Sequence, residues 1–598
     1  MFACRSFFAT LFARHTDHPG DRLRTTDIPA PDSRVVAAST DERGGPTANA
    51  RRRFIWVAAG STLIATTLLW LIGLVMNDGH FLYAFDDTAI HLSIVRQLLG
   101  HGTWGVSSGV YASASSSPGW TLLLAALTAV LPFARNVLPL LMNVAAGIWL
   151  IRLFAREQSF LLPRARDWLG LALTVVLAVV LWFVPGLALL GMEHILHAAL
   201  VVQALVLLQR LQSRRLTPRE CRPYLLVLLL ATLIRYESAF LAVGCALAIV
   251  CVTTARLGNA ETVVHWTRRR ARRLAGMSLI VSALPILVFA AINKSFGDGF
   301  LPNSVEAKTA LQRTAGLGVI REPKQLMMVL TSDPAVLVLL VLAMGYVLWA
   351  WSGGPRRHTA IALAFVVTTL LHAELANFGW HERYQAYLVI AGSYVALQIA
   401  SEVVAPARRS AALALGVLLI FAFSITRIGL LIDTPRASSN TYRQRYQMGL
   451  FLKEYYNGRG FLTGELGYTT YLHDGPVVDI LGLGTHEVLA ERQRHGVTLS
   501  EDFVRNITRR NNIDVMTFYG LWPGFKVPRE WVLVGEWQLK ERKISVPDTQ
   551  VQFYAPDERG AVELERNLRA FAPRLPSRVE VLYRGDLISR FLQTRDDK

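Results

Sequence analysis

Long apolar runs alternate with short polar loops between residues 54 and 432, whereas both ends of the chain have an ordinary polar composition. A helix of about 20 apolar residues matches the hydrocarbon core of a bilayer and satisfies all its backbone polar groups internally. The pattern therefore predicts a multi-pass α-helical membrane protein. About eleven runs are candidates for crossing: 54–76, 137–154, 168–190, 195–211, two short runs on either side of 235–237, 274–292, 336–351, 360–371, 384–400 and 411–432.

One further apolar run, 118–133, is short for a full crossing. If this run crossed, the basic residues that follow residue 154 would fall on the outer side of the membrane. We therefore expect 118–133 to form a re-entrant or surface helix. The next run, 137–154, would then lead back to the cytoplasm.

The charge pattern orients these spans. The chain has 62 Lys and Arg against 44 Asp and Glu, a formal net charge of +18, and basic residues collect in short loops on one side. Cytoplasmic loops are enriched in Lys and Arg, so we expect a bacterial inner-membrane protein with a cytoplasmic N-terminus. Membrane topology explains the charge, and we expect no nucleic-acid partner. The orienting residues include Arg51–Arg53, Arg214, Arg215, Arg268–Arg270, Arg356, Arg357, Arg408 and Arg409.

The two polar ends differ in character. Residues 1–50 have little periodicity and are predicted to be a disordered cytoplasmic tail. Residues 433–598 carry strand-like runs at 477–481, 531–534, 551–554 and 579–582, which indicates a soluble α/β domain outside the membrane. Residues 51–432 form the transmembrane domain between them. The chain has four cysteines and none after Cys251, so the C-terminal domain has no disulfide and no thiolate metal site.

Polar residues that could take part in catalysis or binding lie in the predicted outer loops. Asp86 and Asp87 precede an amphipathic stretch, 88–99. Acidic residues at a helix N-terminus are often only a favourable charged cap. Alternatively, one carboxylate is a general base that accepts the proton of a sugar hydroxyl as it attacks an anomeric carbon.

Three other positions add cationic or intramembrane charge. Residues 296–308 form a Gly- and Pro-containing loop that ends in Lys308, and Arg383 follows His381 beside aromatic residues. Arg235 interrupts two short apolar runs, and an ionisable residue within a membrane is a functional candidate. A turn-forming loop, snorkelling at an aromatic belt and a mutual ion pair are the structural alternatives.

Several motifs in order resemble the GT-C glycosyltransferases, in particular the mycobacterial terminal β-arabinofuranosyltransferase family. The likeness covers residues 54–492. It consists of Asp86-Asp87, Tyr-Ala-Ser-Ala-Ser-Ser-Ser-Pro-Gly-Trp at 111–120, Gly-Met-Glu at 191–193, a Pro-Asn-x-x-x-x-Lys loop ending at Lys308, Gly-Glu-Leu-Gly at 464–467, and Asp-Ile-Leu-Gly-Leu at 479–483. The segment 115–119 departs from the Thr-Ser-Pro-Leu of the family, a difference on the acceptor side.

The resemblance implies a polyprenyl-phosphate-linked sugar donor, inversion at the anomeric carbon, and a glycan or glycolipid acceptor at the outer membrane face. Arabinofuranose is one candidate sugar. Residues 51–432 would be the catalytic domain, and Asp86 the base with Asp87 as its neighbour. The remaining implied roles are the donor site (Lys308, Arg383, His381, Arg235, Glu193 and His194) and the acceptor side (Tyr111, Trp120 and Asn303).

Alternatives of other classes stay open. A lipid or saccharide transporter would explain the spans and the charge at Arg235, although the sequence has no internal repeat of the kind many transporters show. A non-catalytic envelope scaffold is the third class. A protein O-mannosyltransferase or a lipid A aminosugar transferase would share the fold with a different acceptor. No cofactor is required by the sequence, and a divalent metal is compatible with it.

Overall fold

The computed structural model describes most of the chain after its N-terminal segment. The described residues are 48–158, 168–253, 257–258, 266–307, 321–496, 498–520 and 524–584. Lys308 and nearly all of the predicted tail at 1–50 lie outside these ranges.

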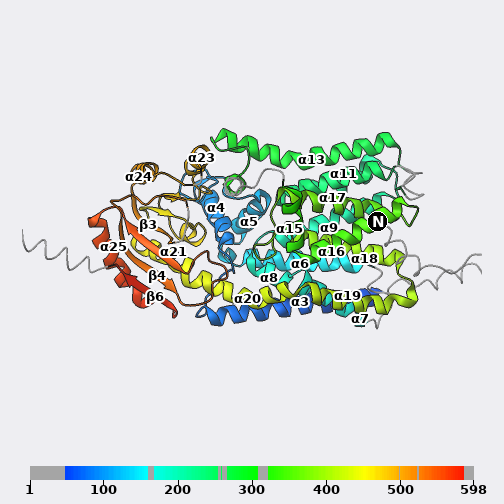
Figure 1. Cartoon of the computed structure of the whole chain (residues 1–598), viewed down its shortest axis with the longest axis horizontal. Coiled ribbons are helices and arrows are strands. Elements are labelled where there is room, and N and C mark those ends of the chain that lie inside the picture. Colours follow the sequence, from blue (N-terminus) through cyan, green and yellow to red (C-terminus); the bar gives the residue numbers. More distant parts are fainter. Residues whose placement is uncertain are drawn as a thin grey trace, which may run out of the picture. The chain divides into compact units, whose positions relative to one another are not determined.

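A bundle of helices forms the first part of the described chain (Figure 1). Eight of these helices are long and apolar enough to cross a membrane. Their outer faces are strongly apolar, since Trp56 and Leu68 of α3 and Leu418 of α19 are 76%, 55% and 67% exposed. Such a surface needs lipid around it, which confirms the prediction of a polytopic helical membrane protein. The eight are α3 (Ala48–Met76), α6 (Leu138–Glu157), α7 with α8 (Trp168–Leu190), α9 (His194–Leu211), α13 (Arg268–Ser295), α16 (Pro334–Trp351), α18 (Ala386–Val403), and α19 (Arg409–Phe423) with the 3-10 turn before it, which together span Pro406–Phe423.

Shorter helices account for the other predicted runs. α10 (Pro218–Ile234), α11 (Ser238–Cys251) and α17 (Thr359–Leu375) correspond to the three remaining crossings, and α10 and α11 break around Arg235 as predicted. The short apolar run after residue 117 forms α5 (Pro118–Val130), a helix of 13 residues. A further short helix, α15 (Pro323–Ser332), precedes α16.

The last predicted run, 411–432, is not one helix. α19 ends at Phe423, and α20 (Ile425–Thr441) starts after Ser424 and continues past residue 432 alongside α3 (Figure 1). The apolar average of the run hides Arg427, which is buried in α20 against Asp333 at the start of α16. A hydropathy pattern reports the lipid-facing residues of a span and misses a charge that a neighbouring helix neutralises.

A six-stranded mixed sheet forms the C-terminal part, as the predicted α/β domain requires. The strand order is β2-β1-β3-β5-β4-β6; β2, β1 and β3 run parallel, and the pairs from β3 to β6 are antiparallel. The four predicted strands are present, and β1 and β3 were not predicted. The strands are β1 (Gly460–Thr463), β2 (Val477–Asp479), β3 (Ile513–Tyr519), β4 (Val532–Leu539), β5 (Gln550–Ala555) and β6 (Val579–Tyr583).

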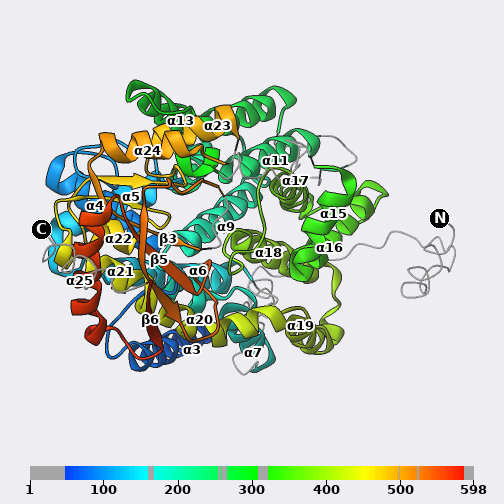
Figure 2. The same ribbon diagram turned by 60° about the vertical axis from the view of Figure 1, so that its left-hand side comes forward.

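Helices cover both faces of this sheet. Alternate residues of β3 enter different cores, because side chains along a strand point to opposite faces: Val515 packs on one side and Met516 on the other. α21 (Gln447–Tyr455) and α25 (Glu558–Phe571) build the first core, and α24 (Glu501–Arg510) with α23 (His486–His495) builds the second (Figure 2).

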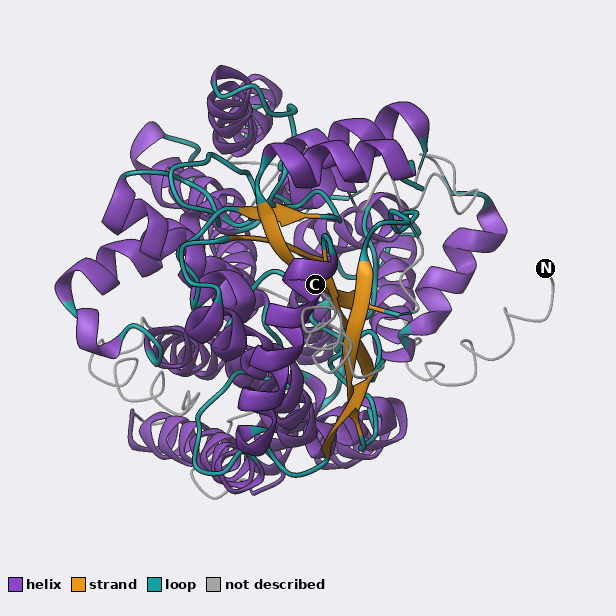
Figure 3. Cartoon of the chain, turned by 90° about the vertical axis from the view of Figure 1, so that its left-hand side faces the viewer, coloured by secondary structure: helices purple, strands orange, loops and turns teal. Residues whose placement is uncertain are grey.

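Between bundle and sheet lies α4 (Asp87–His101), the predicted amphipathic helix, next to α5 (Figure 1). Seen from the sheet end, the strands lie across the ends of the bundle helices (Figure 3). Ser93 Oγ of α4 lies 2.9 Å from Thr470 Oγ1 in α22 (Tyr468–Tyr471), and Arg96 donates to the Thr470 carbonyl at 3.0 Å. These polar contacts fix the helix that begins with the Asp-Asp pair against the C-terminal domain.

Candidate functional site

Asp87 is the accessible member of the Asp-Asp pair. It is the first residue of α4, and its side chain is 32% exposed. Arg383 Nη1 donates to Asp87 Oδ2 at 2.9 Å and also lies 2.9 Å from Met192 Sδ. A carboxylate that is oriented by a guanidinium and still reaches solvent has the geometry of a proton acceptor.

Asp86 has the opposite environment. Its side chain is buried and forms an ion pair with Arg445 at 3.0 Å, and the same guanidinium contacts Glu465 at 3.0 Å. Burial raises the pKa of the Asp86 carboxyl well above its ordinary value; Arg445 opposes this shift, and Glu465 adds to it. The Asp86 side chain is only 8% exposed and is engaged by Arg445, whereas a general base must lie within reach of the acceptor hydroxyl. The resemblance gave the base role to Asp86 with Asp87 as its neighbour; of the two side chains, Asp87 is the more exposed, at 32% against 8%.

The close packing at Asp86 leads to a stability prediction at Gly467. A Cβ at Gly467 would lie 2.7 Å from the Asp86 carbonyl oxygen and 2.8 Å from Oδ2, and Gly467 has φ +90°. Gly458 has φ +80° with nothing within 4 Å. Both Gly→Ala variants place a Cβ at a positive φ, which is unfavourable, but only Gly467→Ala adds a clash with Asp86. We expect Gly467→Ala to lower the thermal unfolding midpoint further than Gly458→Ala does; equal shifts would contradict this packing.

Arg383 is presented by an unusual turn between α17 and α18. Four consecutive residues, Gly379 to Glu382, have positive φ values, of which 50°, 62° and 57° belong to Trp380, His381 and Glu382. The Arg383 guanidinium lies over the Tyr384 ring at 5.1 Å and over the Phe85 ring at 5.4 Å. His381 packs edge-on against Phe85 at 4.7 Å, so it supports the turn.

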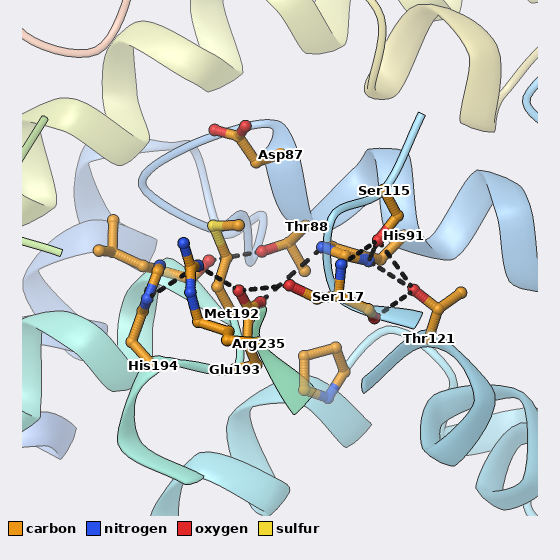
Figure 4. A network of polar contacts seen from close by, with 12 residues as sticks. Asp87, Thr88, His91, Ser115, Ser117, Thr121, Met192, Glu193, His194 and Arg235 are labelled. Carbon is orange, nitrogen blue, oxygen red and sulfur yellow. Dashed lines mark hydrogen bonds and ion pairs between the residues drawn. The ribbon is translucent and has the colours of Figure 1, made fainter. Parts of the chain in front are cut away.

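Arg235 is the centre of a second charged network. It forms ion pairs with Glu193 and Glu237, and its Nη1 lies 3.3 Å from His194 Nδ1. Figure 4 shows Glu193 between Arg235 and Ser117, whose hydroxyl donates to it at 2.7 Å. Asp87 lies apart from this network in the same view, at the start of α4. Glu193 and His194 are therefore buried partners of Arg235.

A cavity of about 360 Å³ opens beside Arg235. The ring of Tyr384 lies between the cavity and the Asp87 site. Its centroid is 6.0 Å from the Arg235 guanidinium and 5.1 Å from the Arg383 guanidinium, which contacts Asp87. One end of the cavity thus presents the Arg235–Glu237 ion pair beside the Tyr384 ring, and the rest is largely apolar. Its lining comprises Ser116, Arg235, Tyr236, Glu237, Ala239, Phe240, Ile286, Leu301, Val305, Leu375, Ala376, Asn377 and Tyr384.

Two of the predicted acceptor-side residues are structural. Trp120 is fully buried in the core between α4, α5 and α6, where an acceptor cannot reach it. Asn303 is also fully buried, and its amide donates to Asp298 at 3.3 Å. The sequence motif placed both residues near the site but could not tell a packing position from a contact position. Tyr111 stacks on Phe296 with ring centroids 4.2 Å apart and remains half-buried.

The sequence reasoning missed Asp298, which ties three segments together. It accepts hydrogen bonds from the Ser113 hydroxyl at 2.8 Å and from the Ser113 backbone at 3.2 Å, and it lies 3.4 Å from His486 of α23. The loop after α13 is thereby fastened to the C-terminal domain. Arg445 was missed for the same reason, since a single charged residue in a polar segment gives no signal of its partner. No group of three or more His, Cys, Asp or Glu side chains within the described residues could hold a metal ion.

Comparison with known proteins gives two kinds of match. The model of a domain of unknown function (DUF8728) matches residues 436–554, which comprise most of the sheet domain. No curated protein matches the chain.

Solved structures match over a longer stretch at low identity. An oligosaccharyltransferase from Archaeoglobus fulgidus is 14% identical over 76% of this chain and 67% of its own, with a TM-score of 0.44. ArnT from Cupriavidus metallidurans, bound to undecaprenyl phosphate, is 12% identical over 83% of this chain and 98% of its own, with a TM-score of 0.46.

The arabinofuranosyltransferase AftD from Mycobacteria is 15% identical over 83% of this chain, with a TM-score of 0.40. This chain covers 40% of the length of that protein. At these identities the likeness concerns the fold.

Proposed function

We propose that this chain is an inverting glycosyltransferase that moves a sugar from a polyprenyl-phosphate donor to a glycan or glycolipid at the outer face of the bacterial inner membrane. The observation that carries the proposal is the arrangement around Tyr384. Its ring joins a largely apolar cavity to two arginines, and one of them holds the accessible carboxylate Asp87.

A lipid-linked phosphate fits this arrangement chemically. The apolar lining suits a prenyl chain, and Arg235 and Arg383 supply donors for a phosphate at the polar end. Both guanidinium groups are buried, where a charge interacts more strongly than in water. Lys308, which the resemblance also assigns to the phosphate, lies outside the described residues.

The proposed reaction is a single displacement. An acceptor hydroxyl oxygen forms a bond to the anomeric carbon while the bond from that carbon to the phosphate oxygen breaks. Asp87 takes the hydroxyl proton, and polyprenyl phosphate leaves with the bonding electrons. Phosphate is a good leaving group, so the site needs a base and charge stabilisation more than an acid. Arabinofuranose stays one candidate for the sugar.

Lipid-phosphate binding tests the donor half of this proposal. Charge-assisted hydrogen bonds contribute about 1.5–3 kcal/mol, so Arg383→Gln should weaken binding of undecaprenyl phosphate about 10- to 100-fold. The measurement is native mass spectrometry of the purified protein with the lipid titrated in detergent. Arg443→Gln is the matched control, because Arg443 is also buried and paired, at 2.8 Å with Glu541, away from the cavity. Equal binding by both variants, or no binding by the unaltered protein, would contradict the donor site.

A further inference from the structure

A buried polar cluster behind the Arg383 turn has no part in the reaction described above. It is composed of Asp333 at the start of α16, Arg427 of α20, and Glu382 and Gln385 of the turn. Arg427 Nη2 contacts Asp333 Oδ2 at 2.5 Å and Glu382 Oε2 at 3.0 Å. The Arg427 and Asp333 side chains are only 4% and 1% exposed. Placing such charges inside a membrane protein is unfavourable unless they are paired.

The turn that this cluster holds is strained. Trp380, His381 and Glu382 all have left-handed backbone conformations, which are unfavourable for residues with a Cβ. Conformations of this kind persist where surrounding contacts over-determine them. Gln385 supplies such contacts, since its Oε1 accepts from the Gly379 backbone at 2.9 Å and its Nε2 donates to Asp333 at 3.0 Å.

Glu382 and Arg383 are adjacent in the sequence but have different partners. Glu382 is tied to Arg427 and Gln385, whereas Arg383, the next residue, reaches Asp87, Met192 and the Tyr384 ring. If the cluster were lost, the turn could relax toward ordinary negative φ values. The Arg383 guanidinium would then leave its position between Asp87 and the cavity wall.

We infer that Asp333, Arg427 and Gln385 are positioning residues: they hold the left-handed turn 379–382 and thereby set the affinity of Arg383 for a lipid-linked phosphate. This inference rests on the proposed function. The three residues come from α16, α20 and the start of α18, so three bundle helices together determine where one cationic side chain lies. None of the three lines the cavity.

A double-mutant cycle tests whether Arg427 acts through Arg383. Arg427→Gln should weaken undecaprenyl phosphate binding about tenfold in the unaltered background. In the Arg383→Gln background, the same substitution should change binding by less than about twofold, because residues that act as a unit are not additive. In the transfer reaction, the donor KM should rise, and kcat should fall less than in Asp87→Asn, because Asp87 is kept and loses only its contact with Arg383.

Hydrogen exchange provides a readout that does not depend on binding or activity. In Arg427→Gln, amides of residues 376–385 should exchange faster, while those of α4 and the sheet should not change. If Arg427→Gln fails to fold, Gln385→Leu keeps the ion pair and removes the bond to Gly379, and it should give the same pattern. Arg443→Gln is the control: it should change the affinity for undecaprenyl phosphate by the same factor in both backgrounds of the cycle.

The possible outcomes distinguish failure of the positioning inference from failure of the proposed function. Lipid binding by the unaltered protein with additive losses, or with unchanged exchange at 376–385, would overturn the inference and leave the proposed function standing. Absence of lipid binding by the unaltered protein would overturn the proposed function and this inference with it. Non-additive losses with faster exchange confined to the turn would support the positioning role.

Discussion

Replacing Asp87 with asparagine is expected to lower sugar transfer by about 100- to 10,000-fold, the usual contribution of a general base. The amide keeps the shape of the side chain and can still contact Arg383, but it cannot accept the proton of the attacking hydroxyl. Undecaprenyl phosphate binding should change little, because the phosphate ligands are arginines. The measurement is transfer from a polyprenyl-phospho-sugar in nanodiscs, with lipid binding followed on the same preparation.

Asp86→Asn is the matched control for that prediction. The Asp86 side chain is only 8% exposed, asparagine keeps its size, and Arg445 retains Glu465 as a charged partner. We expect Asp86→Asn to keep most of its transfer activity. Loss of transfer in Asp86→Asn with normal folding and full activity in Asp87→Asn would reverse the assignment and restore the one that the sequence suggested.

Arg235→Gln should destabilise the protein strongly. Removing one partner of a buried ion pair costs about 3–5 kcal/mol, because the other charge is left unpaired. Here two carboxylates, Glu193 and Glu237, would lose their guanidinium, and Glu193 is fully inaccessible. Thermal unfolding in detergent, followed by intrinsic fluorescence, should show a clear fall in Tm.

Two further variants identify the cause of that loss. Arg235→Gln combined with Glu193→Gln and Glu237→Gln removes all three charges, and it should recover most of the lost stability. Arg459→Gln removes a guanidinium that also has two carboxylate partners, Asp514 and Glu563, but is 39% exposed. Exposed pairs contribute about 0–1 kcal/mol, so its Tm should change little. A similar fall in Arg459→Gln would show that burial is not the cause.

The membrane part of the fold could be predicted from the sequence because lipid imposes a local rule. Each span must be apolar along its own length, so the runs match the helices from α3 to α19 closely. The break between α10 and α11 at Arg235 could also be predicted, because a charged residue interrupts the apolar run there. The exception is the run 411–432, where Arg427 is neutralised by Asp333 of another helix and the hydropathy average conceals the division into α19 and α20.

Strands were harder to predict because their signal is short. β2, β4, β5 and β6 contain runs of Val, Trp or Phe, whereas β1 is only Gly-Phe-Leu-Thr and β3 mixes Asp514 and Thr517 with apolar residues. Both missed strands lie inside the sheet order, where pairing on two edges stabilises them. Such stabilisation comes from neighbours distant in sequence, and a local pattern does not contain it.

The site residues could be predicted by position but not by role. Sequence motifs drew attention to Asp86, Asp87, Arg235 and Arg383, and the structure brings Arg383 to Asp87 and to the Tyr384 ring beside Arg235. The motifs could not tell which aspartate is buried, because Arg445 lies in a different part of the chain. The motif also could not tell that Trp120 is buried, because an aromatic residue in a core and one on a binding surface look the same in a sequence.

The most direct test of the central claim is sugar transfer by the purified, unaltered protein in nanodiscs. A panel of polyprenyl-phospho-sugars, arabinofuranose included, is supplied with envelope glycans and glycolipids, and NMR reads the anomeric configuration of the product. We predict transfer from at least one donor, with inversion, and its loss in Asp87→Asn. Turnover of no donor on the panel, together with movement of lipid-linked sugar across the bilayer, would contradict it and identify a transporter instead.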